Sequence, residues 1–325
     1  MKTKNIIIWS CVATALLIIA VLGTVFDLQI SMALADLQGV EYHSTNLFAI
    51  IGETFGENIL YIFLVTSCGI LFFYLYNKPL AKKWLNICIL VGVALFSFIV
   101  CFYCIHKVLE YLSIYTNFGL KEYISSTIGI ISILLFSVVV DVIAFYLMSK
   151  ISKENLEKLY KWAIVVFIVA LLSNGFVQFS KRIFDRTRYR AMVYVGDTEF
   201  SYYQNWYIIN TNKFNSVSEY ASDFFKSFPS GHTCAAASSF LLVLLPLFLP
   251  QCDNKKWKSI FWISSISYTI LVAFSRLIAG AHFFMDVFVG GLSTFVITMI
   301  AYYVIKRINA KKDTPKLKQT KRTAC

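Results

Sequence analysis

The chain has 325 residues, of which 58% are hydrophobic and only 15% are charged. Soluble domains are roughly 45–50% apolar and about 25% charged, so this composition excludes an ordinary soluble protein. The formal net charge of +12 would suit a nucleic-acid binder, but the basic residues lie mostly in short connections and at the C-terminal end. Membrane proteins carry their orientation signals there, and we expect no nucleic-acid partner.

Apolar stretches recur along the chain, and a spanning helix needs about 20 mostly apolar residues. We expect eight spans, at roughly 6–26, 59–76, 85–106, 124–148, 162–180, 231–250, 259–277 and 283–305. Backbone inside lipid must satisfy its own hydrogen bonds, which favours helices. The sequence therefore predicts an all-α polytopic membrane protein with about eight transmembrane helices.

The charges between the spans predict an orientation. The segment 27–58 has several acids and no Lys or Arg, whereas the connections 77–84, 149–161 and 251–258 are rich in Lys. The tail after Tyr303 is also strongly basic. Because basic connections stay in the cytoplasm, we expect both termini there. The tail, 306–325, could also contact anionic lipid heads.

One segment on the outward side departs from this rule. KRIFDRTRYR, residues 181–190, carries five basic residues. Orientation signals do not explain them, so they need another reason. Arg182, Arg186 and Arg190 either attract anionic headgroups or are simply solvated. The loop 181–229 continues with many aromatic residues, and we expect it to lie on the outer membrane surface.

Polar residues gather at the predicted outward ends of the last four spans. Lys181, Arg188 and Arg276 are cations that can neutralise a phosphate, and arginine adds two-pronged geometry. Ser230 and Gly231 follow Pro229 at a predicted helix start, where free N–H groups favour an anion. These residues suit phosphoryl transfer. Ser275 either caps or packs, or contacts phosphate.

Two of the four histidines belong to the same set. His282 and Asp286 are spaced i, i+4, which places them on one helix face. The acid can then orient an imidazole that acts as a nucleophile. His232 can act as the general acid for the leaving group. A different acid, Asp141, lies inside the span 124–148 and is either a hydrogen-bonded structural group or part of a transport path.

The spacing resembles a known family. Lys181-x6-Arg188, then Pro229-Ser230-Gly231-His232, then Ser275-Arg276-x5-His282-x3-Asp286 is similar to the three-part signature of the type 2 phosphatidic acid phosphatase superfamily. That group includes lipid phosphatases, isoprenoid diphosphate phosphatases, membrane glucose-6-phosphatases and vanadium haloperoxidases. One position differs, because Tyr189 stands where the family usually has proline.

The resemblance implies an activity and a division of the chain. His282 would become a phosphohistidine, His232 would protonate the leaving group, and Asp286 would orient His282. The remaining motif residues, Lys181, Arg188, Ser230, Gly231 and Arg276, would hold the phosphoryl oxygens, with no metal or other cofactor. A six-helix phosphatase core would occupy 85–305, after a two-span extension over 1–84.

Three functions remain open at this stage. A lipid phosphatase would act on phosphatidate, phosphatidylglycerol phosphate or undecaprenyl diphosphate at the outer membrane face. A lipid phosphotransferase would use the same site with an alcohol acceptor, and an anion transporter would use only the cations. The frequent Lys and Ile and the absence of an N-x-Ser/Thr sequon suggest a bacterial plasma membrane; in a eukaryote the outer side would be lumenal.

Overall fold

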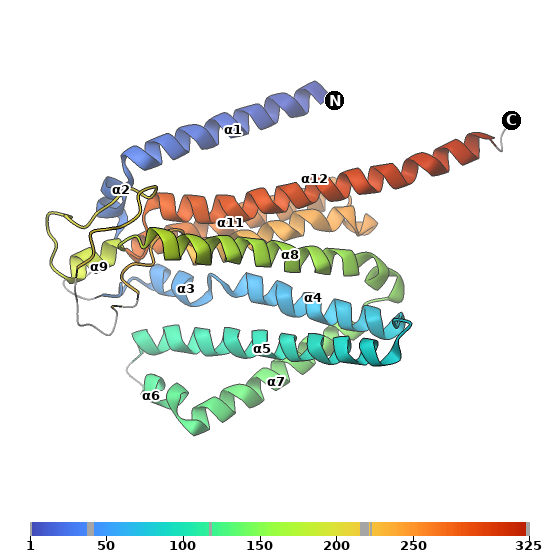
Figure 1. Cartoon of the computed structure of the whole chain (residues 1–325), viewed down its shortest axis with the longest axis horizontal. Helices are drawn as coiled ribbons and strands as arrows, with labels where there is room; N and C mark the ends of the chain where they lie inside the picture. The colour runs from blue at the N-terminus through green and yellow to red at the C-terminus, as the bar shows by residue number, and fades with distance from the viewer. Residues whose placement is uncertain (1, 38–41, 117–118, 215–220, 222, 323–325) are drawn as a thin grey trace. The chain divides into compact units, whose positions relative to one another are not determined.

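The computed structural model describes residues 2–37, 42–116, 119–214, 221 and 223–322, and in these residues all regular secondary structure is helical (Figure 1). The helices are α1 (Lys2–Val25), α2 (Asp27–Leu34), α3 (Leu47–Phe55), α4 (Asn58–Asn77), α5 (Lys83–Tyr115), α6 (Leu120–Ser125), α7 (Thr127–Ser149), α8 (Lys153–Phe184), α9 (Tyr189–Tyr194), α10 (Gly231–Ala237), η1 (Ser238–Leu247), η2 (Pro250–Cys252), α11 (Lys255–Ile278) and α12 (Phe284–Arg322).

Within the described residues, six helical stretches are long and apolar enough to cross a membrane: Leu47–Asn77, Lys83–Tyr115, Thr127–Ser149, Lys153–Tyr194, Lys255–Ile278 and Phe284–Ala310. Many of their large apolar side chains are exposed, such as Leu171 at 74% and Ile128 at 72%. Water would penalise such a surface, whereas lipid accommodates it. The predicted all-α polytopic membrane protein is confirmed.

Fewer than the expected eight helices of the described residues are long and apolar enough to span a membrane. Ser10–Val25 and Asp27–Leu34 meet at a bend of 77°, and together they give a seventh span at most. The expected span 231–250 is a shorter apolar helix, Gly231–Leu247. Its second half is a 3-10 helix that contains Pro246, which has no N–H to donate along an α-helix.

The chain forms two compact units. Unit 1 comprises Met1–Gly56, Asn174–Cys234 and Thr269–Leu292, and unit 2 comprises Glu57–Ser173, Ala235–Tyr268 and Ser293–Cys325. The predicted boundaries at residues 84 and 305 divide the chain by role, into an extension, a catalytic core and a tail. The two compact units divide it by packing, so the predicted boundaries stay a prediction. Residues 323–325 of the predicted tail lie outside the described residues.

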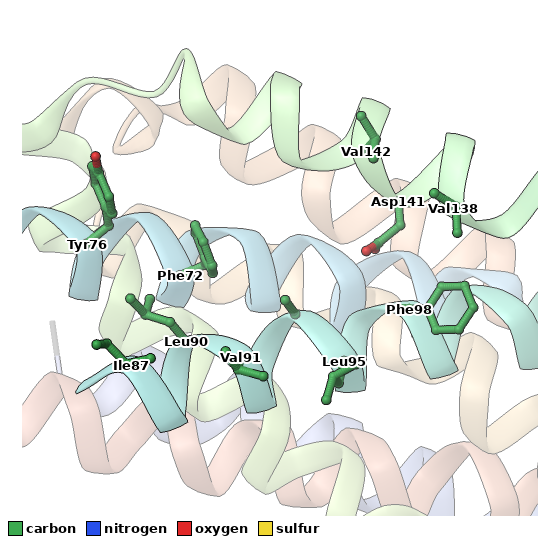
Figure 2. A pocket seen from close by; sticks show the side chains of 11 residues that line it. Phe72, Tyr76, Ile87, Leu90, Val91, Leu95, Phe98, Val138, Asp141 and Val142 are labelled. Atoms are coloured by element: carbon green, nitrogen blue, oxygen red, sulfur yellow. The ribbon is translucent and has the colours of Figure 1, made fainter. Parts of the chain in front are cut away.

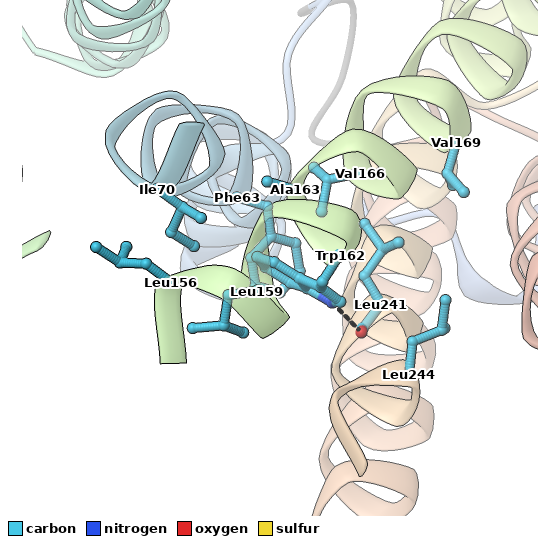
Figure 3. Close-up of a cluster of buried hydrophobic side chains, with 10 residues drawn as sticks. All are labelled: Phe63, Ile70, Leu156, Leu159, Trp162, Ala163, Val166, Val169, Leu241 and Leu244. Carbon is cyan, nitrogen blue, oxygen red and sulfur yellow. Dashed lines mark hydrogen bonds between the residues drawn. The ribbon is translucent and has the colours of Figure 1, made fainter. Parts of the chain in front are cut away.

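Unit 2 is built around an apolar core. Within it, α4, α5 and α7 pack side by side (Figure 1). Buried side chains from α4, α8 and η1 form one cluster, which contains Phe63, Ile70, Leu156, Leu159, Trp162, Ala163, Val166, Val169, Leu241 and Leu244 (Figure 3). Trp162 Nε1 donates to the carbonyl of Leu241 at 2.9 Å, so the ring packs without leaving its N–H unsatisfied.

A hollow of about 570 Å³ lies between α4, α5 and α7 of unit 2, and Asp141 is the acidic residue among its mostly apolar lining (Figure 2). Ser97 Oγ donates to the Asp141 carboxylate at 2.6 Å. A polar group in an apolar setting needs such a partner. The bond favours the structural reading of Asp141 over the transport one.

Unit 1 joins the N-terminal helices to the motif segments. Asn46 caps α3, because its side-chain oxygen accepts the N–H groups of Phe48 at 2.9 Å and Ala49 at 3.3 Å. On α9, the buried side chains of Tyr189 and Met192 pack against Phe283. Phe283 follows His282 in the chain, so this packing holds the segment before α12 in place.

The Trp162 bond can be tested by the change Trp162→Phe. We expect a loss of about 1–3 kcal/mol, because the buried Leu241 carbonyl loses its donor. The measurement is the apparent thermal unfolding midpoint in detergent. The control is Trp257→Phe, since Trp257 is 42% exposed and should tolerate the change. Equal midpoints for the two variants would contradict the expectation.

Candidate active site

The three motif blocks meet inside unit 1. Lys181 lies in the last turn of α8, Arg188 precedes α9, and Ser230 precedes α10. Arg276 lies in the last turn of α11, and Asp286 in the first turn of α12. The ends of distant helices thus bring together residues that are far apart in sequence. The side chains of Arg188, Ser230, His232, Ser275, Arg276, His282 and Asp286 are all buried.

His282 is held by a backbone carbonyl. Its Nδ1 lies 2.6 Å from the oxygen of Ser227. A carbonyl only accepts hydrogen bonds, so Nδ1 must carry the proton. In a neutral ring, Nε2 then keeps its lone pair, and this atom lies 3.5 Å from an Arg188 guanidinium nitrogen. The geometry presents Nε2 as the reactive atom.

The pKa of His282 is lowered well below the usual value of 6.5. Burial is the largest cause, because it penalises the charged ring, and the charges of Arg188, Arg276 and Lys181 act in the same direction. His232 also contributes, so Lys181 and His232 both lie near enough to influence His282. The ring is therefore neutral at physiological pH, which a nucleophile requires.

Asp286 contacts His282 only indirectly, through Ser227. Its Oδ2 lies 3.9 Å from Nδ1, beyond hydrogen-bonding distance. That oxygen instead accepts the hydroxyl of Ser227 and the N–H of Phe283, the latter at 2.9 Å. The residue whose carbonyl holds His282 is thus itself held by Asp286. The helix-face argument does not apply, because α12 begins at Phe284, after the histidine.

Arg188 is fixed in three directions. It donates to the side chain and the carbonyl of Asp223, both at 2.9 Å, and to the carbonyl of Ala281 at 2.9 Å. Burial alone would raise the pKa of Asp223, but the charges of Arg188 and Arg190 lower it. Asp223 therefore remains an anion that positions a cation next to His282.

Arg276 is held differently. One terminal nitrogen donates to Glu53 Oε1 at 2.9 Å. Its Nε and other terminal nitrogen are buried and have no hydrogen-bond partner among the described residues. Buried donors without acceptors are unfavourable, and the oxygens of a phosphoryl group would satisfy both. Arg276 thus has buried donors that could hold a phosphoryl oxygen, the role that the sequence suggested for it.

Arg186 and Arg190 were expected to be solvated or to contact lipid headgroups, and this expectation is wrong for both. Arg186 and Arg190 are only 1% and 3% exposed. Arg186 donates to Asp286 at 2.6 Å and to Asp27 at 2.7 Å. Arg190 donates to Asp223 at 2.9 Å and to Glu53 at 3.3 Å. Both form internal ion pairs rather than headgroup contacts, because each buried guanidinium reaches two carboxylates.

The remaining motif residues mainly contact backbone carbonyls. The N–H of Ser230 donates to the carbonyl of Asp286 at 2.9 Å, so it is not a free anion donor. His232 Nε2 lies 3.0 Å from the carbonyl of Glu53. Ser275 Oγ donates to the carbonyl of Val272 at 2.7 Å, which favours the packing alternative. Gly231, at the start of α10, is partly exposed.

No group of three or more His, Cys, Asp or Glu residues that could hold a metal ion occurs in the described ranges. Residues 161–310 match the family model described as the PAP2 superfamily. This part of the chain is similar to the PAP2 superfamily. Every candidate site residue lies within the matched segment. No solved structure matches the chain.

The match to the PAP2 superfamily model supports a phosphatase-type hydrolase. Several residues around the site were missed by the sequence analysis: Asp27, Glu53, Arg186, Arg190, Asp223 and Ser227. The alternation of arginines at 186, 188 and 190, in a segment where orientation rules disfavour them, was a signal for buried pairing. Nothing local identified Asp27 or Glu53, since both precede the PAP2 segment.

The approach of α12 to the second motif can be tested at Gly290. A Cβ added there would lie 2.5 Å from the backbone oxygen of Ser230, so Gly290→Ala must displace that segment. We expect phosphate release to fall by about 10²-fold, the typical effect of a misplacement near 1 Å. Gly175→Ala is the matched control, because its Cβ would meet nothing within 4 Å. Full activity of Gly290→Ala would contradict the expectation.

Proposed function

We propose that this protein is a membrane lipid phosphatase that forms a phosphohistidine on His282. The observation that carries the proposal is the neutral, buried His282, whose Nε2 lone pair lies beside Arg188. A nucleophile next to a guanidinium suits attack on a phosphorus atom, because the cation stabilises charge on the phosphoryl oxygens.

The reaction proceeds in two steps. His282 Nε2 attacks phosphorus, the bond from phosphorus to the leaving oxygen breaks, and His232 donates a proton to that oxygen. Water then attacks the phosphohistidine while His232 takes back a proton, and inorganic phosphate leaves. The phosphoryl oxygens are held by Arg276 through a donor that has no partner among the described residues, and by Arg188, Lys181, the Ser230 hydroxyl and Gly231. No metal takes part in either step.

The membrane setting favours a lipid substrate. The chain has six or seven candidate spans in its described part, so the tail of a lipid can stay in the bilayer while its phosphate enters the site. The connections 77–84, 149–161 and 251–258 are basic, and basic connections favour the cytoplasm, which supports a site on the extracytoplasmic side. Candidate substrates are phosphatidate, phosphatidylglycerol phosphate and undecaprenyl diphosphate.

The direct test is phosphate release by the purified protein in mixed micelles that contain EDTA, with each of the three lipids. We expect release by the wild type and a loss of at least about 10³-fold in His282→Ala, because the nucleophile is removed. His106→Ala is the control, since His106 lies on α5 in unit 2.

The outcomes separate the alternatives. Equal release by His282→Ala and the wild type would refute the phosphohistidine. Transfer of phosphate to an added lipid alcohol, in preference to water, would favour the phosphotransferase. Anion uptake into vesicles without any phosphate release would favour a transporter.

The lowered pKa of His282 also predicts a pH dependence. A lowered pKa keeps the imidazole unprotonated at more acidic pH, so protonation of His282 should not reduce kcat/KM near pH 6.5. We expect the acidic limb of the kcat/KM profile to lie clearly below pH 6.5. The measurement is kcat/KM against pH, corrected for ionisation of the substrate phosphate. A limb centred at the usual histidine pKa would contradict the expectation.

A further inference from the structure

Glu53, on α3, connects the N-terminal segment to the phosphate-binding groups. Its side chain is 2% exposed. Oε1 accepts from Arg276 at 2.9 Å and from Arg190 at 3.3 Å. Its backbone oxygen lies 3.0 Å from His232 Nε2, and because a carbonyl only accepts, that nitrogen carries a proton. One residue outside the PAP2 segment thus contacts a phosphate-binding arginine and the proposed general acid.

Small residues let α3 come this close. A Cβ on Gly52 would lie 1.9 Å from Ser275 Oγ, and one on Gly56 would lie 2.9 Å from Val272. Ala49 is buried against Ala279 and Ala281. Small side chains at such spacing allow two helices to approach at backbone distance. The contact explains why Ser275 is buried, and it sets the position of Glu53 next to Arg276.

The charges around Glu53 are unequal. Its single carboxylate faces two guanidiniums, and Arg190 also pairs with Asp223. Arg276 has no other carboxylate among the ion pairs of the described residues, and two of its donors stay open. Glu53 therefore both aims Arg276 and offsets part of its charge. A bound phosphoryl group would experience less positive potential than the arginines alone would produce.

We infer that Glu53 is a positioning residue and the internal counter-charge of the phosphate-binding arginines. It orients Arg276 and His232, and it limits the affinity for inorganic phosphate so that the product can leave. The inference rests on the proposed function, because it assumes that Arg276 binds phosphate. It makes the catalytic site incomplete without the segment 42–56, which lies outside the PAP2 segment.

The test measures the affinity for inorganic phosphate in the purified full-length protein and its variants in detergent. Calorimetry gives the dissociation constant, and inhibition of the reaction by added phosphate gives a second, independent value. In Glu53→Gln, the side-chain oxygen can still accept from Arg276 but the charge is lost. We expect phosphate affinity to rise by about three- to tenfold, as loss of one partly screened charge predicts. The kcat should fall because phosphate leaves more slowly. Glu53→Asp keeps the charge and should stay near wild-type affinity.

Asp36→Asn is the matched control. It removes the same charge from another residue that precedes the PAP2 segment, but Asp36 is exposed and its carboxylate accepts from Asn46 at 2.9 Å. We expect its phosphate affinity to remain within about twofold of the wild type, since an exposed charge is well screened. A merely structural role for Glu53 would reduce the number of competent sites without raising their affinity.

Arg190→Gln provides the opposite change if Glu53→Gln does not fold. Without Arg190, more of the Glu53 charge acts on Arg276, so phosphate affinity should fall. Unchanged affinity in Glu53→Gln or in Arg190→Gln would overturn the inference while leaving the proposed function intact. No phosphate binding by either the wild type or Glu53→Gln would also overturn the inference, whereas only the absence of phosphate release from lipids would overturn the proposed function.

Discussion

The structure of unit 1 depends on a buried network of arginines and carboxylates. Arg186, Arg188, Arg190 and Arg276 pair with Asp27, Glu53, Asp223 and Asp286. A buried charge without a partner is strongly unfavourable, so each ion constrains the position of its neighbours. One series of ion pairs runs from Arg276 through Glu53, Arg190 and Asp223 to Arg188. A second series joins Asp27 to Asp286 through Arg186. His282 lies between them, so the network determines the electrostatic setting of its imidazole ring.

The network has two consequences for the site. Near-complete pairing keeps most of the buried charge neutralised, which allows a polar centre to exist inside an apolar chain. Incomplete pairing at Arg276 leaves donors available where an anion is needed. The cations that remain effective around His282 also keep its ring neutral. The same charges therefore keep the His282 ring neutral and leave donors open for an anion, as the proposed reaction requires.

The PAP2 segment does not contain all members of this network. Asp27 and Glu53 come from helices that precede it, and they reach Arg186 and Arg276 across 159 and 223 positions of sequence. The small residues on α3 show that this segment is fitted to α11 rather than loosely attached. An N-terminal segment that resembles a simple addition by hydropathy thus supplies buried charges next to the phosphatase motif.

Sequence by itself determined the helical membrane class and the motif residues, because hydropathy and motif spacing are local properties of the chain. It also predicted His282, His232 and Arg276 as candidate site residues, because their side-chain types suit phosphoryl transfer. Only the tertiary structure decided which acid holds each arginine, since pairs such as Arg190 and Glu53 depend on where distant helix ends meet. The same holds for Asp286, which reaches His282 through Ser227. The i, i+4 spacing could not reveal this, because the helix begins after the histidine.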